Sequence, residues 1–193
     1  MKKAVFIDKD GTLIYDVPYN VDPDRITLYP DAGWALHQWQ QAGFLLLVIS
    51  NQSGVAHGFF PESALEAVSD RLQQLLQSYG VRLDGFYYCP HYPGGRVPAY
   101  SVSCSCRKPQ PGLLQQAARE HGIDLAASWM IGDILNDVEA GNRAGCRTIL
   151  LDNGHETEWR SGPLREPTYT VSDWKEAVQL FENPRVNSLA PTH

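Results

Sequence analysis

The chain has 193 residues, of which 43% are hydrophobic and 20% are charged. This length and composition are typical of one globular domain that needs no disulfide framework to fold. The 16 Lys and Arg residues against 22 Asp and Glu residues give a formal net charge of −6, which argues against a nucleic-acid partner. No apolar run approaches the ~18 residues of a membrane span. Only four apolar residues separate Lys3 from Asp8, too few for a signal peptide, so we expect a cytoplasmic protein with no membrane partner.

The first half of the chain alternates short apolar runs with apolar residues at helical spacing. The runs are too short for buried helices and predict strands, whereas apolar residues at i, i+3, i+4 and i+7 predict amphipathic helices. Gly43 and Gly80 follow the helical segments and predict their C-terminal ends. In chain order we predict a strand at 4–7, a helix at 32–42, a strand at 44–49, a helix at 65–79 and a strand at 85–89.

Residues 90–111 are rich in Pro, Gly and Ser and have no periodicity. Because this segment is long for a plain loop, we expect a metal or a function to hold it. Beyond it we predict a helix at 113–121, a strand at 129–131, a helix at 138–144, a strand at 146–151 and a helix at 174–181 with Ser172 as its N-cap. Residues 182–193 carry no pattern, so we expect a single domain over 1–181 followed by a disordered tail.

The predicted order of elements indicates the α/β class. Strands that alternate with helices pair in parallel through right-handed crossovers, so we expect a doubly wound, Rossmann-like, mostly parallel sheet with helices on both faces. The spacing of the elements leaves no room for a large cap domain. Ligands bind such sheets beyond the carboxyl ends of the strands. Asp8, Ser50 and Asp133 each lie at the end of a predicted strand, and we expect them to converge on one edge.

Two acidic motifs follow predicted strands. Asp8 and Asp10 belong to Asp-Lys-Asp-Gly-Thr, and Asp133 and Asp137 belong to Gly-Asp-Ile-Leu-Asn-Asp. Carboxylates held close together repel one another, and a hard divalent cation such as Mg²⁺ relieves that repulsion. A solvated turn is the alternative for a lone Asp-x-Asp-Gly. The second motif at another strand end favours one shared cation site.

In this combination the chain resembles the haloacid dehalogenase-like phosphotransferase superfamily. The resemblance covers about residues 4–151, and Ser50 stands where many relatives have Thr, which keeps the hydroxyl. The four signature elements appear in order as Asp8-Lys9-Asp10-Gly11-Thr12, Ser50-Asn51-Gln52, Lys108-Pro109, and Gly132-Asp133 with Asp137.

The resemblance implies a catalytic role for several of these residues. Asp8 would be the nucleophile that forms an aspartyl-phosphate, and Asp10 would be the general acid and then the general base. Ser50 and the backbone of Asn51 would donate hydrogen bonds to the phosphoryl oxygens. Lys108 would neutralise the charge on the aspartyl-phosphate. Phosphoryl transfer chiefly needs positioning and charge neutralisation, which these groups supply.

The resemblance also implies a catalytic Mg²⁺ site. Asp8 and Asp133 would bind the cation through their side chains. Asp10 would bind it through its backbone carbonyl. Asp137 would lie behind these ligands without binding the cation directly.

Four potential metal ligands form a C-x-H pair and a C-x-C pair separated by twelve residues. Three thiolates and one imidazole suit a tetrahedral Zn²⁺ with no open position, so we predict a structural zinc in a loop insertion at 89–108. The alternative is separate buried thiols and a surface histidine, which the pairing within a Pro- and Gly-rich loop disfavours. Cys146 lies inside a predicted strand and is expected to be a buried thiol. The predicted zinc ligands are Cys89, His91, Cys104 and Cys106.

Two cationic residues, Arg107 and Lys108, directly follow Cys106. A metal-fixed loop would hold both of them over the phosphate, which is a hypothesis that zinc removal tests. Arg107 can also bind a second, non-transferring phosphate through its bidentate fork. The alternative is that Arg107 is a surface arginine beside a metal loop and does not bind phosphate.

The cysteine element narrows the resemblance to two branches, the heptose bisphosphate phosphatases and the histidinol phosphatases. The loop between the ligand pairs is typically shorter in the histidinol branch, so the chain resembles the heptose branch. That resemblance implies removal of the C7 phosphate of D-glycero-D-manno-heptose 1,7-bisphosphate, in ADP- or GDP-heptose biosynthesis for lipopolysaccharide. Histidinol phosphate or another small sugar phosphate is the alternative substrate. Carried over by position, the substrate-binding residues would be Asp16, Tyr19, Ser50, Asn51, Gln52, Ser53, Arg107 and Lys108.

One departure from the heptose branch is Ile134, which follows Asp133 where Lys is often found. It leaves the preferred anomer open.

Two other classes of protein fit less well. A zinc-binding module with an inactive core would lack a catalytic carboxylate, and none is missing here. A phosphatase for nucleic-acid ends would need a basic groove with stacking aromatics. We therefore expect a monomeric phosphatase that takes a small sugar phosphate.

Overall fold

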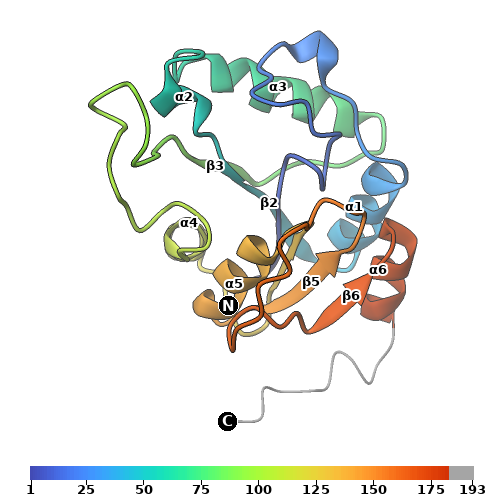
Figure 1. Cartoon of the computed structure of the whole chain (residues 1–193). Coiled ribbons are helices and arrows are strands. Elements are labelled where there is room, and N and C mark those ends of the chain that lie inside the picture. Colours follow the sequence, from blue (N-terminus) through green and yellow to red (C-terminus); the bar gives the residue numbers. More distant parts are fainter. Residues whose placement is uncertain (183–193) are drawn as a thin grey trace.

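The computed structural model describes residues 1–182, and its centre is a sheet of six parallel strands in the order β3-β2-β1-β4-β5-β6 (Figure 1). The apolar N-terminal strand β1 lies in the middle of the sheet, between β2 and β4. The strands are β1 Lys3–Ile7, β2 Phe44–Asn51, β3 Gly85–Cys89, β4 Trp129–Gly132, β5 Arg147–Leu151 and β6 Tyr169–Val171.

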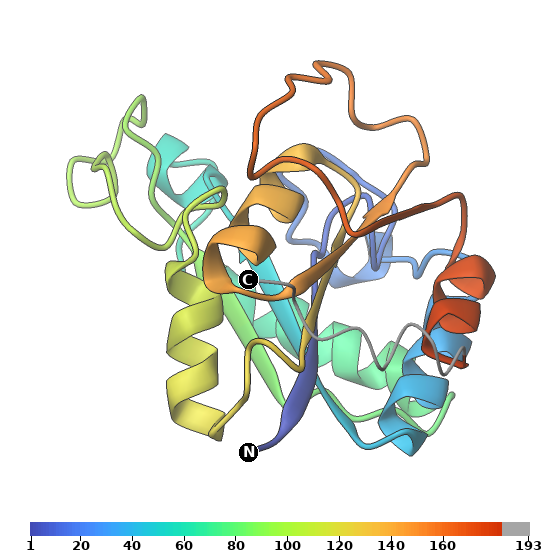
Figure 2. The same cartoon turned by 90° about the horizontal axis from the view of Figure 1, so that it is seen from below.

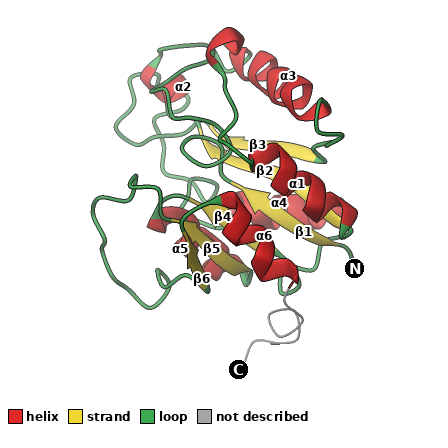
Figure 3. Cartoon of the chain, turned by 90° about the vertical axis from the view of Figure 1, so that its right-hand side faces the viewer, coloured by secondary structure: helices red, strands yellow, loops and turns green. Residues whose placement is uncertain are grey.

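Helices cover both faces of the sheet, as expected for a doubly wound fold. The apolar sides of α1, α3 and α6 form one core with alternate residues of the central strands, and those of α4 and α5 form a second core with the remaining residues. Figure 3 shows α1 and α6 on the near side of the sheet and α4 beyond it. The helices are α1 Ala32–Gln41, α2 Gly54–His57, α3 Ala64–Gln77, α4 Gly112–His121, α5 Leu135–Ala144 and α6 Trp174–Glu182, with a short 3-10 helix at Pro23–Arg25.

The continuous apolar run of β1 is explained by burial on both faces. Val5 and Ile7 pack into the core beneath α1 and α3, whereas Ala4 and Phe6 pack into the core beneath α4. All four side chains are fully buried. A central parallel strand has no solvent face, so it carries no polar alternation. The first polar side chain, Asp8, therefore comes where the strand leaves the sheet.

The elements predicted from the sequence are confirmed, with changes at their ends. The sheet edge is the main difference, because the short strand β6 at Tyr169–Val171 was not predicted. Strand β2 continues to Asn51, and α5 begins at Leu135 instead of residue 138. The expectation that Ser172 caps the last helix is wrong. Asp173 caps it instead, because its carboxylate accepts the Glu176 backbone N–H at 2.8 Å.

Long loops leave the carboxyl edge of the sheet and surround it. Figure 2 shows two of them, the segment at about 90–111 and the segment between β5 and β6, standing out from the layers of helices. Within residues 1–182, no connection contains a second sheet, as expected for a protein without a large cap domain. None of the helices in this part of the chain has the length and apolar character that a membrane crossing requires. Of the expected tail at 182–193, residue 182 ends α6, and 183–193 lie outside the described residues.

Candidate active site

A tight turn after β1 brings the first acidic motif to the carboxyl edge of the sheet. The Asp8 backbone N–H donates to the Ile131 carbonyl of β4 at 2.9 Å, which continues the parallel pairing past the strand end. The turn then closes as Leu13 N–H donates to the Lys9 carbonyl at 3.0 Å. Gly11 has a φ of +81°, and a Cβ there would lie 2.1 Å from an Asp133 carboxylate oxygen. The turn therefore requires glycine, which lets it pack directly on the second acidic motif.

Three buried carboxylates meet at this edge. Ligand oxygens of Asp8, Asp133 and Asp137 all lie within 4.8 Å of one another. Burial, opposed by Lys108 and reinforced by Asp137, raises the pKa of Asp8 to about 7. Burial and the nearby Asp8 raise the pKa of Asp133 to about 6. Burial also raises the pKa of Asp137. Burial and mutual repulsion therefore disfavour three ionised carboxylates here unless positive charge balances them.

Lys108 supplies the cation inside the cluster. Its side chain is only 3% exposed, and its ammonium contacts Asp8 Oδ1, Asp137 Oδ1 at 2.7 Å and the Ile49 carbonyl at 2.9 Å. Burial lowers the pKa of Lys108, but the two carboxylates outweigh it and the pKa is raised. One ammonium among three carboxylates leaves a deficit of positive charge. The hard oxygen donors of Asp8 and Asp133 thus fit a divalent cation such as Mg²⁺.

The segment Ser50-Asn51-Gln52, at the end of β2, connects Asp10 of the first acidic motif to Lys108. The Asn51 side chain accepts the Lys108 backbone N–H at 3.0 Å and donates to the Lys108 carbonyl at 3.1 Å. This reciprocal pair fixes the backbone that carries the buried lysine. The Gln52 amide donates to Ser50 Oγ at 2.7 Å and to Asp10 Oδ2 at 3.0 Å. Residues at or just after the ends of β1 and β2 therefore form one hydrogen-bonded site with the segment before α4.

Two adjoining hollows open over these residues and share Asp10, Asp16 and Asn51. One has a volume of about 450 Å³ and contains the carboxylates and Lys108. The other, of about 320 Å³, is lined by several of the residues predicted to bind substrate. The lining of the larger hollow includes Asp8, Asp10, Ser50, Lys108, Asp133 and Asp137, and that of the smaller includes Lys9, Asp16, Tyr19, Asn51, Gln52 and Ser53.

Arg107 is the one predicted substrate-binding residue that lines neither hollow. Its guanidinium lies 5.0 Å from the centre of the Tyr92 ring and donates to the His91 carbonyl at 3.3 Å. It lines another hollow, of about 400 Å³, which Lys108 also lines. Its assignment to the substrate stays a prediction.

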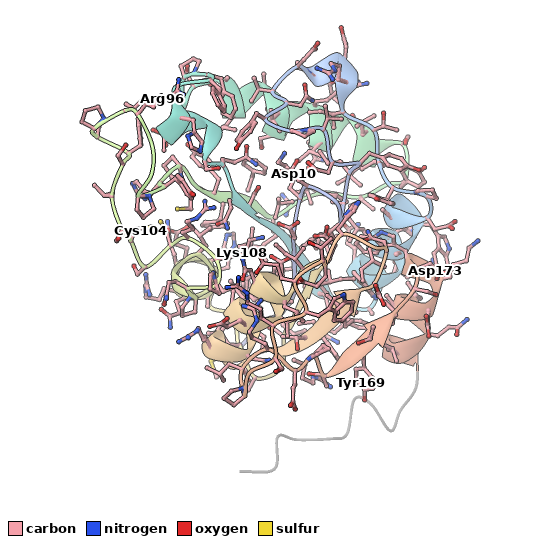
Figure 4. All side chains as sticks on the ribbon, viewed as in Figure 1. Asp10, Arg96, Cys104, Lys108, Tyr169 and Asp173 are labelled. Atoms are coloured by element: carbon pink, nitrogen blue, oxygen red, sulfur yellow. The ribbon has the colours of Figure 1, made fainter. Side chains whose placement is uncertain are left out.

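The cysteine cluster gathers next to this segment. Cys106 Sγ lies 3.1 Å from Cys89 Sγ and 3.2 Å from Cys104 Sγ, and His91 Nδ1 lies 3.3 Å from Cys106 Sγ. The sulfur separations are well above the ~2.05 Å of a disulfide bond. They approach the roughly 3.8 Å that tetrahedral Zn–S bonds of about 2.3 Å imply. Figure 4 shows Cys104 on the outer loop and Lys108 inward of it. Cys146 lies apart and is buried, as predicted.

The acidity of the thiols fits a metal ligand set. Burial raises the pKa of Cys89 and of Cys106. Burial also opposes ionisation of Cys104, but hydrogen bonds from Cys106 and the Arg107 backbone bring its pKa down to about 7. One thiolate is therefore accessible near neutral pH, and a bound cation lowers the pKa of the others further. The residues present fit a closed Zn²⁺ site.

Comparison with known proteins agrees with this arrangement. A family model described as HAD-hydrolase-like matches residues 105–177. A D-glycero-beta-D-manno-heptose-1,7-bisphosphate 7-phosphatase of Haemophilus ducreyi is 45% identical over 151 residues, which are 78% of this chain and 82% of that protein. The chain belongs to the haloacid dehalogenase-like phosphatases.

Two further relatives of this phosphatase match most of its length. The enzyme of the same name from Escherichia coli K12 is 37% identical over 172 residues, which are 89% of this chain and 86% of that protein. The crystal structure of D,D-heptose 1.7-bisphosphate phosphatase from B. bronchiseptica, complexed with magnesium and phosphate, superimposes with a TM-score of 0.80 at 32% identity. That alignment covers 93% of this chain and 98% of that one.

The phosphatase site also contains residues to which the sequence assigned no role. His155 Nδ1 lies 2.6 Å from Asp133 Oδ2, and Thr12 Oγ1 donates to Asp133 Oδ1 at 3.0 Å. Asn153 Nδ2 donates to the Gly11 carbonyl at 2.7 Å. Asn153 and His155 belong to no motif. Their only signal is position, because they follow β5, whose carboxyl end lies at the same edge of the sheet as Asp8.

Proposed function

We propose that this phosphatase removes the C7 phosphate of D-glycero-D-manno-heptose 1,7-bisphosphate through an aspartyl-phosphate on Asp8. The observation that carries the mechanism is the buried contact between Asp8 and Lys108 beside a hollow of about 450 Å³. The substrate rests on the names of the relatives, which are 37–45% identical and match most of the chain. The product would enter ADP- or GDP-heptose biosynthesis.

In the first step, an Asp8 carboxylate oxygen attacks phosphorus and forms the Asp8–O–P bond. The bond between phosphorus and the C7 oxygen breaks, and that oxygen takes a proton from the Asp10 carboxyl group. Lys108, Ser50 Oγ and the Asn51 backbone N–H would bind the phosphoryl oxygens. These groups are fixed before substrate arrives, so little reorganisation is needed as charge develops.

In the second step, water hydrolyses the aspartyl-phosphate. The Asp10 carboxylate takes a proton from the water, whose oxygen attacks phosphorus. The Asp8–O–P bond breaks, which restores the Asp8 carboxylate and releases inorganic phosphate. Asp10 thus ends each cycle protonated, ready to act as the acid again.

The residues that would hold Mg²⁺ are the side chains of Asp8 and Asp133 and the backbone carbonyl of Asp10. When bound, the cation supplies positive charge that offsets the charge of the phosphoryl group. Asp137 would not bind it directly, because its Oδ1 lies 2.7 Å from the Lys108 ammonium and so holds that lysine in place. The charge deficit of the cluster supports this assignment.

A structural Zn²⁺ would be held by Cys89, His91, Cys104 and Cys106. Thiolate ligands of this kind persist in a reducing compartment, which supports a cytoplasmic location. A monomeric state is part of the proposal. Light scattering of the purified protein tests that part.

The substrate proposal is tested by comparing kcat/KM across a panel. It should contain both anomers of the heptose bisphosphate, histidinol phosphate and fructose 1,6-bisphosphate. The expected result is a clear preference for one heptose bisphosphate anomer. Asp16, Tyr19 and Ser53, which line the smaller hollow, would contact the rest of the sugar. A preference for histidinol phosphate would overturn the substrate, and absence of turnover with every ester would overturn the function.

A further inference from the structure

Lys9 lies between the two carboxylates of the first motif and is almost completely buried. Its residue is 1% exposed, and its ammonium pairs with Asp10 Oδ1 at 2.5 Å. Among the described residues, Asp10 is the polar partner of this ammonium. The Asp10 side chain is 33% exposed, so the pair joins a buried cation to a carboxylate that reaches the hollows.

The second oxygen of the same carboxylate is held by Gln52, which directly follows β2. The Gln52 amide donates to Asp10 Oδ2 at 3.0 Å, and Gln52 is only 6% exposed. Its backbone is fixed in turn, because the Gln52 N–H donates to the Cys89 carbonyl at 2.8 Å. Each of the two oxygens of Asp10 therefore has its own donor, one from the preceding residue and one from the segment after β2.

Lys9 cannot easily move away from this contact. Its carbonyl accepts the backbone N–H groups of Leu13 and Ile14, both at 3.0 Å, which fixes the turn around it. A buried ammonium without a partner is costly, so the side chain gains by staying on Asp10. Each carboxylate oxygen has two lone pairs, so these contacts leave capacity for a substrate oxygen or a water.

We propose that Lys9 and Gln52 are positioning residues that aim the Asp10 carboxyl group at the leaving oxygen where the two hollows meet. The proposal rests on the proposed function, in which Asp10 protonates that oxygen. Neither residue would touch the transferred phosphoryl group. Their effect should then depend on how much the leaving group needs a proton.

Lys9→Met, Lys9→Arg and Gln52→Leu test the proposal in single-turnover experiments. Each is assayed with the heptose bisphosphate, whose sugar alkoxide needs protonation, and with p-nitrophenyl phosphate, whose leaving group does not. Lys9→Met should slow phosphoenzyme formation from the sugar phosphate by about 10–100-fold, because the acid loses its alignment. Formation from p-nitrophenyl phosphate should stay close to that of the unmodified protein. Lys9→Arg should restore most of the lost rate. Gln52→Leu also frees Ser50 Oγ, to which the Gln52 amide donates at 2.7 Å, so it should slow both reactions but the sugar phosphate reaction more.

Equal losses with both substrates, in variants whose thermal unfolding is unchanged, would show a structural role and overturn the proposal. No loss in either variant would overturn it as well. If Lys9→Met does not fold, Gln52→Leu decides instead, because it leaves the buried ammonium paired. Its ratio of rates for the two substrates is then compared with that of Ser50→Ala, which removes only the contribution of Ser50. Asp8→Asn tests the proposed function separately from the positioning role of Lys9 and Gln52. Turnover that survives Asp8→Asn contradicts the proposed function itself, whereas an inactive Asp8→Asn with no leaving-group dependence in the other variants contradicts only the positioning pair.

Discussion

The carboxylate cluster and the cysteine cluster are both candidate metal sites, but different parts of the fold hold them. Asp8 and Asp133 follow the neighbouring parallel strands β1 and β4. The Asp8 N–H donates to the Ile131 carbonyl and so keeps the two strands paired. Three of the four cysteine-cluster ligands lie on a loop that the sheet does not hold. The sheet itself organises the first site, whereas we expect the loop of the second site to depend on a bound metal.

This difference predicts that the two sites fail in different ways. Damage to the carboxylate cluster should reduce turnover and leave the fold intact. Damage to the cysteine cluster should reduce stability, and should reduce turnover only through Lys108, which lies two residues after Cys106 in the chain.

The largest expected effect is that of Asp8→Asn on turnover. The amide cannot form the aspartyl-phosphate, so kcat should fall by at least about 10³-fold. The variant should remain folded, since it removes one of three mutually repelling buried carboxylates. Steady-state kinetics and thermal unfolding of the same preparation check both parts. Substantial residual activity would contradict the assignment of the nucleophile.

Loss of zinc should give the largest change in stability. Cys106→Ala removes one ligand, and we expect a loss of about 3 kcal/mol, or a fall in Tm of roughly 6–12 °C. Cys146→Ala is the matched control, because it removes a buried thiol that lies outside the cluster. Metal analysis should find one zinc per chain in the control and none in Cys106→Ala. Equal stability and turnover after zinc removal would show that the loop is held without it.

Asn51→Ala should affect both sites moderately, because Asn51 joins β2 to the segment that follows the cysteines. The variant loses the hydrogen bonds at 3.0 and 3.1 Å to the Lys108 backbone. We expect a loss of about 1–2 kcal/mol of stability and a decrease in kcat of about 10-fold as Lys108 shifts. Urea unfolding and kcat, measured together, check this. A change confined to KM would instead indicate that Asn51 acts only through substrate binding.

The smallest expected effect, measured for each pH unit, is a pH dependence of stability in magnesium-free buffer. The pKa of Asp8 is raised to about 7 and that of Asp133 to about 6, chiefly by burial. Between about pH 4 and pH 7 the folded state therefore binds more protons than the unfolded state, so stability is greatest at the acid end and decreases as pH rises. The expected slope is on the order of 1 kcal/mol per pH unit. Added Mg²⁺ should raise the Tm more at neutral pH than at acid pH. Stability that increases over this range would contradict the account.

The sequence predicted best what the backbone alone determines. A buried strand that ends at Asp8, and another that ends before Asp133, place both acids on one edge whatever the surrounding side chains do. The paired spacing of Cys89, His91, Cys104 and Cys106 likewise predicted a cluster that the structure brings within 4.8 Å. Local patterns of this kind need no knowledge of long-range contacts.

Contacts between side chains from distant elements could not be predicted in this way. His155 reaches Asp133 across a loop without a motif, and only the folded chain shows that Gln52 contacts Asp10. The strand β6 was missed because three residues with an exposed Thr170 carry too weak a pattern. The orientation of Arg107 toward Tyr92 depends on the fold of the cysteine loop.

The most direct test of the central claim is to locate the phosphoryl group during turnover. Asp10→Asn, which should slow hydrolysis of the intermediate, is mixed with p-nitrophenyl phosphate, quenched in acid and digested for mass spectrometry. The account predicts one added phosphoryl group on the peptide that contains Asp8, and none when Asp8→Asn is introduced as well. A phosphoryl group on any other residue, or transfer of phosphate to water with Asp8 never modified, would contradict it.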